Sequence, residues 1–261
     1  MPPHNLIRSF VIGAAFAVAA CSPAAAPPAA TQPATEAPRT SAPSPTPIPT
    51  ATASPAPTPT AATVRYVAIG ASDTVGVGAS DPAHGSWPAR VATRLPAGAT
   101  YANLGVSGSL ASQASREQLP GAIAQRPTLV TIWLAVNDLN ATVETAAYAQ
   151  ALGEIVDGLL QRTDATIFVG NVPDLRVVPV YAQVDKTVLL ARVTAYNQVI
   201  AQVAARNARR VLVVDLFTGS AELVSSATVA QDGFHPSDAG YQLIADRFVA
   251  AMKAGGVTLQ S

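Results

Sequence analysis

Residues 64–73 read VRYVAIGASD, a short apolar run that ends in a glycine, a serine and an acid. A nearly continuous apolar run of this length is typical of a strand that is covered on both faces of a sheet. Four later segments have the same character, at residues 100–103, 129–134, 166–169 and 211–214. We therefore predict five short strands, the first of them at residues 64–69.

Longer stretches with helical periodicity lie between these runs. Apolar residues recur there at spacings of three and four, in series that begin at Trp87, Tyr148, Leu189 and Tyr241. Such spacing places the apolar side chains on one face of a helix. Alternating strands and helices predict an α/β domain in which a parallel sheet lies between two helix layers. Ligands of such sheets bind beyond the carboxyl ends of the strands, so the residues that follow each strand are the candidates for a site.

The stretch DGFHP at residues 232–236 holds the strongest candidate for acid–base chemistry. His235 is one of only two histidines beyond residue 4, and the other is His84. Imidazole is the side chain whose ordinary pKa lies nearest neutral pH, which makes His235 the expected general base. Asp232, three residues earlier, is placed to orient the ring and to stabilise its charged form. His84 stands in a turn-rich segment, and we expect it to be a solvated loop residue.

A base of this kind needs a nucleophile, and Ser72 is the candidate. It follows the first predicted strand and Gly70, a placement that presents a hydroxyl at the edge of the sheet near the start of a helix. A serine in that position is equally often a helix cap or a turn residue. The sequence leaves both interpretations of Ser72 open.

Two further strand ends carry groups that suit an oxyanion. Gly108 follows the second strand and offers a backbone N–H, and Asn137 follows the third strand and offers a side-chain amide. Together with the N–H of Ser72, these groups would supply three hydrogen-bond donors. Each residue also has an ordinary interpretation, Gly108 as a turn glycine and Asn137 as a capping or turn residue.

Taken together, these four blocks resemble the SGNH hydrolases, also called the GDSL esterase/lipase family. Ser72 matches the family's serine, Gly108 its glycine, Asn137 its asparagine and His235 its histidine, with Asp232 completing the last block. The similarity covers the whole predicted domain. It implies a flavodoxin-like three-layer α/β/α fold with a five-stranded parallel sheet, and hydrolysis of esters or thioesters through an acyl-enzyme without a metal or organic cofactor.

Two positions depart from the family pattern. The first block usually reads Gly-Asp-Ser, but here Ala71 precedes the serine and an acid, Asp73, follows it. The third block usually begins with glycine, and here it begins with Ala135. Both changes bear on how the loops hold Ser72 and Asn137. The competing hypothesis is therefore a domain of the same fold with weakened catalysis that binds a glycan or lipid.

The first sixty residues predict export and tethering. Residues 10–20 form an apolar run behind Arg8, and the segment VAAC at residues 18–21 resembles a bacterial lipobox, in which the cysteine is lipidated. The alternative is an ordinary signal peptide with an incidental cysteine. Cys21 is the only cysteine in the chain, which favours lipidation. We predict a signal peptide at residues 1–20, a lipidated Cys21 with a linker rich in Ala, Pro, Ser and Thr to residue 62, and a catalytic domain at residues 63–261.

Composition excludes some partners and leaves the substrate open. Sixteen basic and sixteen acidic residues balance, so the composition gives no electrostatic sign of nucleic-acid binding, and we expect no nucleic-acid partner. We expect a monomer outside the cytoplasm that meets the membrane only through its lipid and acts on a small or glycan acyl ester. Residues 171–174, after the fourth strand, are expected to shape a substrate pocket together with Val177, Pro179 and Tyr181.

Overall fold

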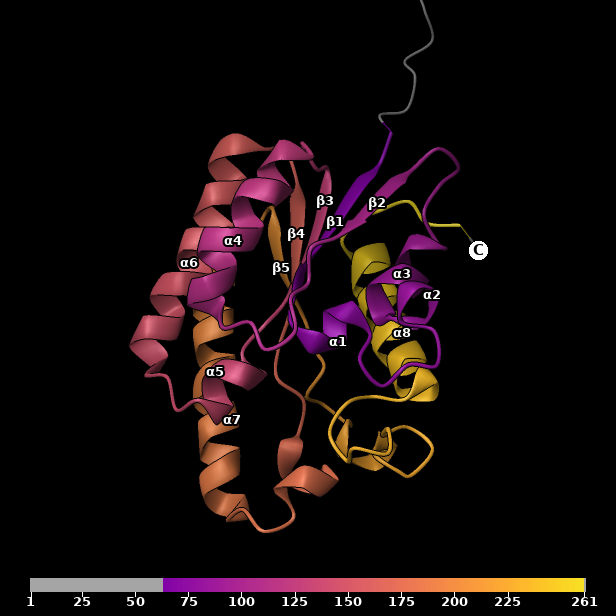
Figure 1. Ribbon diagram of the computed structural model, residues 1–261. Coiled ribbons are helices and arrows are strands. Elements are labelled where there is room, and N and C mark those ends of the chain that lie inside the picture. Colours follow the sequence, from indigo (N-terminus) through magenta and orange to yellow (C-terminus); the bar gives the residue numbers. More distant parts are fainter. Residues whose placement is uncertain (1–62, 261) are drawn as a thin grey trace, which may run out of the picture. The chain divides into compact units, whose positions relative to one another are not determined.

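The computed structural model describes residues 63–260, which contain a five-stranded parallel sheet (Figure 1). The strands lie in the order β2-β1-β3-β4-β5, which is the flavodoxin-like order. Their bounds are β1 Arg65–Gly70, β2 Thr100–Asn103, β3 Leu129–Trp133, β4 Thr166–Gly170 and β5 Val211–Val214. Each differs from the predicted strand by at most one residue at either end, so the α/β fold with a parallel sheet is confirmed.

Helices cover both faces of this sheet (Figure 1). The helices α4, α6 and α7 lie on one face, at Ala111–Ala124, Thr145–Arg162 and Lys186–Ala205. On the other face lie α3 and α8, at Trp87–Ala92 and Asp238–Ala254. Shorter helices follow the strands or lie in loops, namely α1 Ser72–Val75, α2 Pro82–Gly85, α5 Val136–Asn140, η1 Leu175–Val177, η2 Pro179–Tyr181 and η3 Ala221–Leu223.

Alternation along β1 divides the core in two. Val67 and Ile69 pack with α4, α6 and α7, whereas Tyr66 and Ala68 pack against α3 and α8. In the second, smaller core the rings of Trp87 and Phe248 stack with centroids 4.1 Å apart. The central strands are thus buried on both faces, as their apolar runs predict.

The edge strands differ from that expectation. Both β2 and β5 are partly exposed, because each has a hydrogen-bonded neighbour on one side only. The sequence VLVV of β5 nevertheless reads like that of a central strand, whereas TYAN in β2 is half polar.

The structure also contains a helix that periodicity does not reveal. Helix α4 is rich in Ala, Ser and Gln and carries Pro120 within it, so it has few large apolar residues to mark a buried face. No helix within residues 63–260 is long and apolar enough to cross a membrane. The predicted signal peptide, Cys21 and the linker lie outside the described residues and stay predictions, as does the domain boundary at residue 63.

Candidate active site

Ser72 occupies the tight connection between β1 and α1. Gly70 ends the strand where a Cβ atom would lie 2.0 Å from Thr74 Oγ1, so only glycine fits there. The carbonyl of Ala71 accepts hydrogen bonds from the amides of Thr74 and Val75, which makes Ala71 the cap and Ser72 the first residue of the helix. The Ser72 side chain does not cap α1 and is free to act outside the helix.

The structure brings Ser72 to His235, 163 residues away in the sequence. His235 Nε2 lies 2.9 Å from Ser72 Oγ, and its Nδ1 lies 2.5 Å from Asp232 Oδ2. The other carboxylate oxygen, Asp232 Oδ1, accepts hydrogen bonds from the amides of Phe234 and His235 at 2.9 and 3.0 Å. The chain turns at Gly233, whose φ of 70° suits glycine. Three residues predicted to act together therefore form one hydrogen-bonded row.

The charges in this row are unevenly exposed. The side chain of His235 is 15% exposed and that of Asp232 is 45% exposed. Burial disfavours the ionised form of Asp232, but the hydrogen bonds from the His235 ring and from the two amides outweigh it and hold the pKa of Asp232 below its ordinary value. Asp232 is thus a stable anion that can support a positive charge on His235.

Asn137 contacts the loop that carries Gly108. Asn137 Nδ2 donates to the carbonyl of Ser109 at 3.1 Å, which uses one of its two amide hydrogens. Gly108 has a φ of 79°, with open space where a Cβ would stand. No hydrogen bond from the amides of Ser72 or Gly108 is present among residues 63–260. A small cleft lined by Ala71, Asp73, Ser109, Trp133, Leu134, Ala135, Val136 and Asn137 lies beside these donors.

Gln118 is a functional candidate that the sequence analysis missed. Its side chain, 3% exposed, accepts from the amide of Gly70 at 3.0 Å and donates to the carbonyl of Gly70 at 2.9 Å. The same side-chain amide lies 3.1 Å from Ser109 Oγ. Gln118 therefore joins the serine loop to the loop of Gly108. The sequence held no usable signal for it, because α4 packs mainly through alanines and was not itself predicted.

Asp138 makes a second link that the sequence analysis did not identify. It is 1% exposed, and both of its carboxylate oxygens accept from the amide of Ala111 at the start of α4. Burial raises its pKa to about 6, although the hydrogen bond from Ala111 opposes the rise. Asp138 thus anchors the helix that follows Gly108 to the block that carries Asn137.

The two departures from the family pattern have different structural consequences. Ala71 has a negative φ of −114°, which an alanine adopts without strain. Ala135 has a φ of 115°, in the region that favours glycine. The backbone of this alanine is therefore strained. Asp73, which follows the serine, is half-buried, and its pKa rises to about 6, mainly because of burial.

The remaining candidates fall outside this arrangement. His84 bonds to Asp81 at 2.7 Å and lies in α2 rather than in a loop, but its side chain is 86% exposed, as expected for a solvated residue. A larger cavity, whose lining includes the two neighbours of His235 in the sequence, is lined by Pro173 and Asp174 from the predicted pocket segment, but not by Val177, Pro179 or Tyr181. Within residues 63–260 no group of three or more His, Cys, Asp or Glu side chains is arranged to hold a metal ion.

Solved structures with the same fold include several esterases. TesA shares 22% identity with this chain at a TM-score of 0.58, covering 73% of this chain and 99% of its own. A variant of an acetylxylan esterase from Geobacillus stearothermophilus shares 21% identity at a TM-score of 0.59, covering 72% of this chain and 94% of its own. A family 3 carbohydrate esterase from Clostridium thermocellum shares 20% identity at a TM-score of 0.56, covering 74% and 96%.

Sequence comparison gives the family directly. No curated protein sequence matches the chain significantly. The family model for GDSL-like lipases and acylhydrolases matches residues 68–243, a span that runs from β1 into α8 and includes Ser72, Gly108, Asn137 and His235. The chain belongs to the GDSL-like lipase/acylhydrolase family.

Proposed function

We propose that this hydrolase is a serine esterase that cleaves carboxylic esters or thioesters through an acyl-enzyme. The observation that carries the proposal is the row Ser72–His235–Asp232, with contacts of 2.9 and 2.5 Å. A serine within hydrogen-bond reach of an imidazole that is itself oriented by a carboxylate is the arrangement that activates a hydroxyl as a nucleophile.

Each residue has a defined step in this reaction. His235 Nε2 takes the proton of Ser72 as Ser72 Oγ attacks the ester carbonyl, and Asp232 stabilises the imidazolium that forms. The amides of Ser72 and Gly108 and the free side-chain hydrogen of Asn137 are the donors for the oxyanion. His235 then gives the proton to the leaving alcohol or thiol. In the second half, a water molecule gives a proton to His235 and attacks the acyl carbonyl, and His235 returns that proton to Ser72 Oγ as the acid leaves.

The rival hypothesis, a glycan- or lipid-binding domain with weakened catalysis, has less support. It rests on Ala71 and Ala135, and the contacts between Ser72, His235 and Asp232 are intact beside both. We infer further that the enzyme works outside the cytoplasm, tethered through a lipidated Cys21 and the linker, on the strength of the lipobox-like segment at residues 18–21.

Hydrolysis of p-nitrophenyl acetate and butyrate by the purified protein tests the proposal. Replacing Ser72 or His235 with Ala should reduce kcat by about 10⁴-fold or more, because the triad acts as a unit. The matched controls are Ser112→Ala, an exposed serine on α4, and His84→Ala, the exposed histidine that also pairs with an aspartate. Both controls should keep wild-type activity. A Ser72→Ala variant that retains turnover would refute the mechanism.

A further inference from the structure

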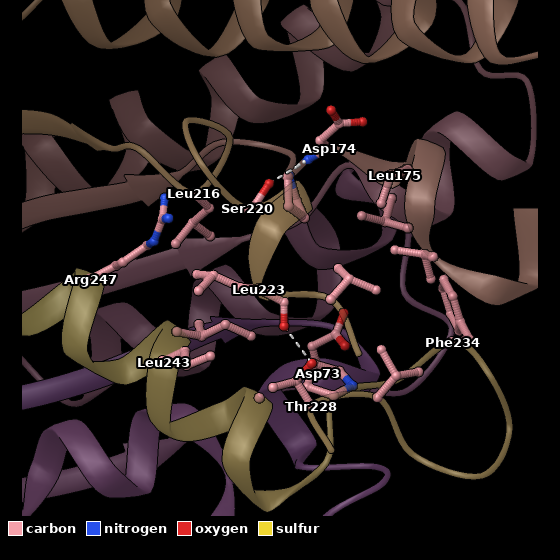
Figure 2. A pocket seen from close by; sticks show the side chains of 18 of the residues that line it. Asp73, Asp174, Leu175, Leu216, Ser220, Leu223, Thr228, Phe234, Leu243 and Arg247 are labelled. Carbon is pink, nitrogen blue, oxygen red and sulfur yellow. Dashed lines mark hydrogen bonds between the residues drawn. The ribbon is translucent and has the colours of Figure 1, made fainter. Parts of the chain in front are cut away.

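An apolar cavity of about 130 Å³ is lined by Asp73 and Phe234, which adjoin Ser72 and His235 in the sequence (Figure 2). Its walls come mainly from the segments that follow β4 and β5 and from α8. They include Leu175, Val178, Leu216, Leu223, Phe234 and Leu243. A cavity of about 150 Å³ accommodates a benzene ring, so this one suits a chain of about four to six carbon atoms.

The cavity adjoins the oxyanion donors. Asp73, Trp133 and Val136 line both this cavity and the small cleft that contains Asn137. Neither Ser72 nor His235 lines it, but their neighbours do: Asp73 follows the serine, and Phe234 precedes the histidine with its ring 4.7 Å from the imidazole. A leaving group must stay beside His235 Nε2 to receive its proton. The apolar space therefore suits the acyl side of an ester.

Asp73 is the one acidic group on this wall that forms no salt bridge or hydrogen bond with another described residue, although it lies close enough to His235 for the charge on that histidine to lower its pKa. Its carboxyl makes no hydrogen bond to any other described residue, and Figure 2 shows it among the apolar side chains of the cavity. The other charged residues of the wall are engaged elsewhere. Asp174 pairs with Arg176 at 2.6 Å, and Arg247 Nη1 donates to the carbonyl of Asp215 at 2.9 Å. A half-buried carboxylate in apolar surroundings favours a ligand that brings a hydrogen-bond donor.

We propose that Asp73 is a specificity residue for hydroxyacyl esters. Its carboxylate accepts a hydrogen bond from a hydroxyl near the ester carbonyl. The rest of the acyl chain, about four to six carbons, fills the cavity. A hydroxyl fits better than an ammonium group because moving a full positive charge into an apolar cavity costs far more than moving a neutral donor. This inference rests on the proposed esterase function and adds the class of acyl group. It gives a role to the acid at residue 73, which the mechanism does not use.

The first test compares kcat/KM for p-nitrophenyl 3-hydroxybutyrate and p-nitrophenyl butyrate, using the full-length protein. The wild type should prefer the hydroxy ester by about tenfold or more, as expected for a hydrogen bond to a charged group. Asp73→Leu should abolish or reverse this preference, and Asp73→Asn should keep part of it. The ratio cancels any effect that residue 73 has on Ser72 itself.

The matched control is Asp174→Asn on the same wall, which should leave the ratio of the two kcat/KM values unchanged. The proposal would be overturned by a wild-type ratio near one. It would also be overturned if Asp73→Leu kept the same ratio as the wild type.

A series of unsubstituted p-nitrophenyl esters from acetate to octanoate tests the chain length. The highest kcat/KM should fall at four to six carbons, as the cavity volume implies. A maximum at acetate would contradict the placement of the acyl chain in the cavity.

A binding measurement separates this proposal from the esterase function. The Ser72→Ala variant, titrated with methyl 3-hydroxybutyrate and methyl butyrate and followed by NMR, should bind the hydroxy ester more tightly. The double variant Ser72→Ala/Asp73→Leu should lose that difference. Equal binding of both esters by Ser72→Ala would overturn the role of Asp73 even if the enzyme cleaves esters. Absence of turnover by the wild type, with the binding difference present, would instead refute only the esterase function.

Discussion

His84 and His235 each follow an aspartate by three residues, and in both pairs the ring nitrogen Nδ1 bonds to that carboxylate. The side chains of Asp81 and His84 are 60% and 86% exposed, respectively, so this pair is solvated. The side chain of His235 is only 15% exposed and forms a hydrogen bond with Ser72. The motif Asp-x-x-His thus builds the same local contact twice. Burial and a hydroxyl from another strand end make only one of the two pairs a candidate for catalysis.

Ala135 carries the clearest backbone strain near the site, with a φ of 115°. Strain of this kind costs about 1–3 kcal/mol, which Ala135→Gly should relieve. The gain is offset by a lost buried methyl group, worth about 0.8 kcal/mol, and by greater freedom of the unfolded chain, about 0.4–1 kcal/mol. We expect the free energy of unfolding in urea to change by between about −1 and +2 kcal/mol, centred on a rise of about 0.5 kcal/mol.

Ala122 provides the control for this change. It is also fully buried but lies inside α4, where Ala122→Gly should cost about 1–2 kcal/mol in lost helix propensity and packing. If Ala135→Gly destabilises the protein as much as Ala122→Gly does, the strain at Ala135 is not significant.

At the scale of elements, α4 organises the site although it was not predicted. Its N-terminus is held by Asp138, and its buried Gln118 reaches Gly70 and Ser109. The strands were predictable because their apolar runs are continuous, and four helices because their apolar residues are large and periodic. Helix α4 packs mainly through alanines, which give almost no periodic signal. The links through Gln118 and Asp138 join residues far apart in the chain, so no local pattern could reveal them.

Gln118→Leu tests whether this link positions the serine loop. The substitution keeps the approximate volume but leaves the buried N–H of Gly70 without its partner, which should lower the free energy of unfolding by about 1–3 kcal/mol. Because Gln118 also bonds near the oxyanion donors, kcat should fall by about tenfold or more with little change in KM. The control is Gln113→Leu, on the same helix, whose side chain bonds only to Glu117. A loss of stability with unchanged kcat would show that Gln118 has a structural role only.

The raised pKa of Asp138 predicts that the stability of the protein depends on pH. Its pKa is about 6 in the folded protein and 3.8 ordinarily, so between these values the folded state keeps a proton that the unfolded state releases. Stability from this group is present below pH 3.8 and is lost as the pH rises through 6. Asp138→Asn cannot ionise. Its free energy of unfolding relative to the wild type should therefore rise by about 1–3 kcal/mol between pH 4.5 and 7.5.

Urea unfolding at several pH values measures this difference. Asp157→Asn, an exposed substitution on α6, serves as the control and should give a pH profile parallel to that of the wild type. A parallel profile for Asp138→Asn as well would contradict the raised pKa of Asp138.

At the scale of the whole molecule, the sequence was sufficient for the fold class and for the contact of Ser72 with His235 and of His235 with Asp232. Ser72 follows β1, and Asp232 and His235 lie in the loop between β5 and α8, at the end of the sheet where parallel strands gather their ligands. The roles of Gly108 and Asn137 as oxyanion donors stay predictions. The cavity was less accessible to prediction. Its walls come from five separate parts of the chain, namely α1, the end of β3 with α5, the segments after β4 and β5, and α8, and only Pro173 and Asp174 were among the residues expected there.

The proposed tether also belongs to this scale. If Cys21 is lipidated, Cys21→Ser in the full-length chain should move the protein from the membrane fraction to the soluble extracytoplasmic fraction of its host. Detergent phase partitioning measures the change, and hydrolysis of p-nitrophenyl butyrate by the released protein should match that of the wild type. A wild-type protein that partitions entirely into the aqueous phase would contradict lipidation.

Covalent labelling of Ser72 tests the central claim most directly. A fluorophosphonate reacts with a serine only when a neighbouring base activates it, so it reports on the contact between Ser72 and His235 without any assumption about the substrate. The full-length protein should gain the mass of one phosphonyl group on the peptide that contains Ser72, the His84→Ala variant should label equally, and the His235→Ala variant should not label. A folded wild-type protein that stays unlabelled, or that is labelled at another serine, would contradict the account.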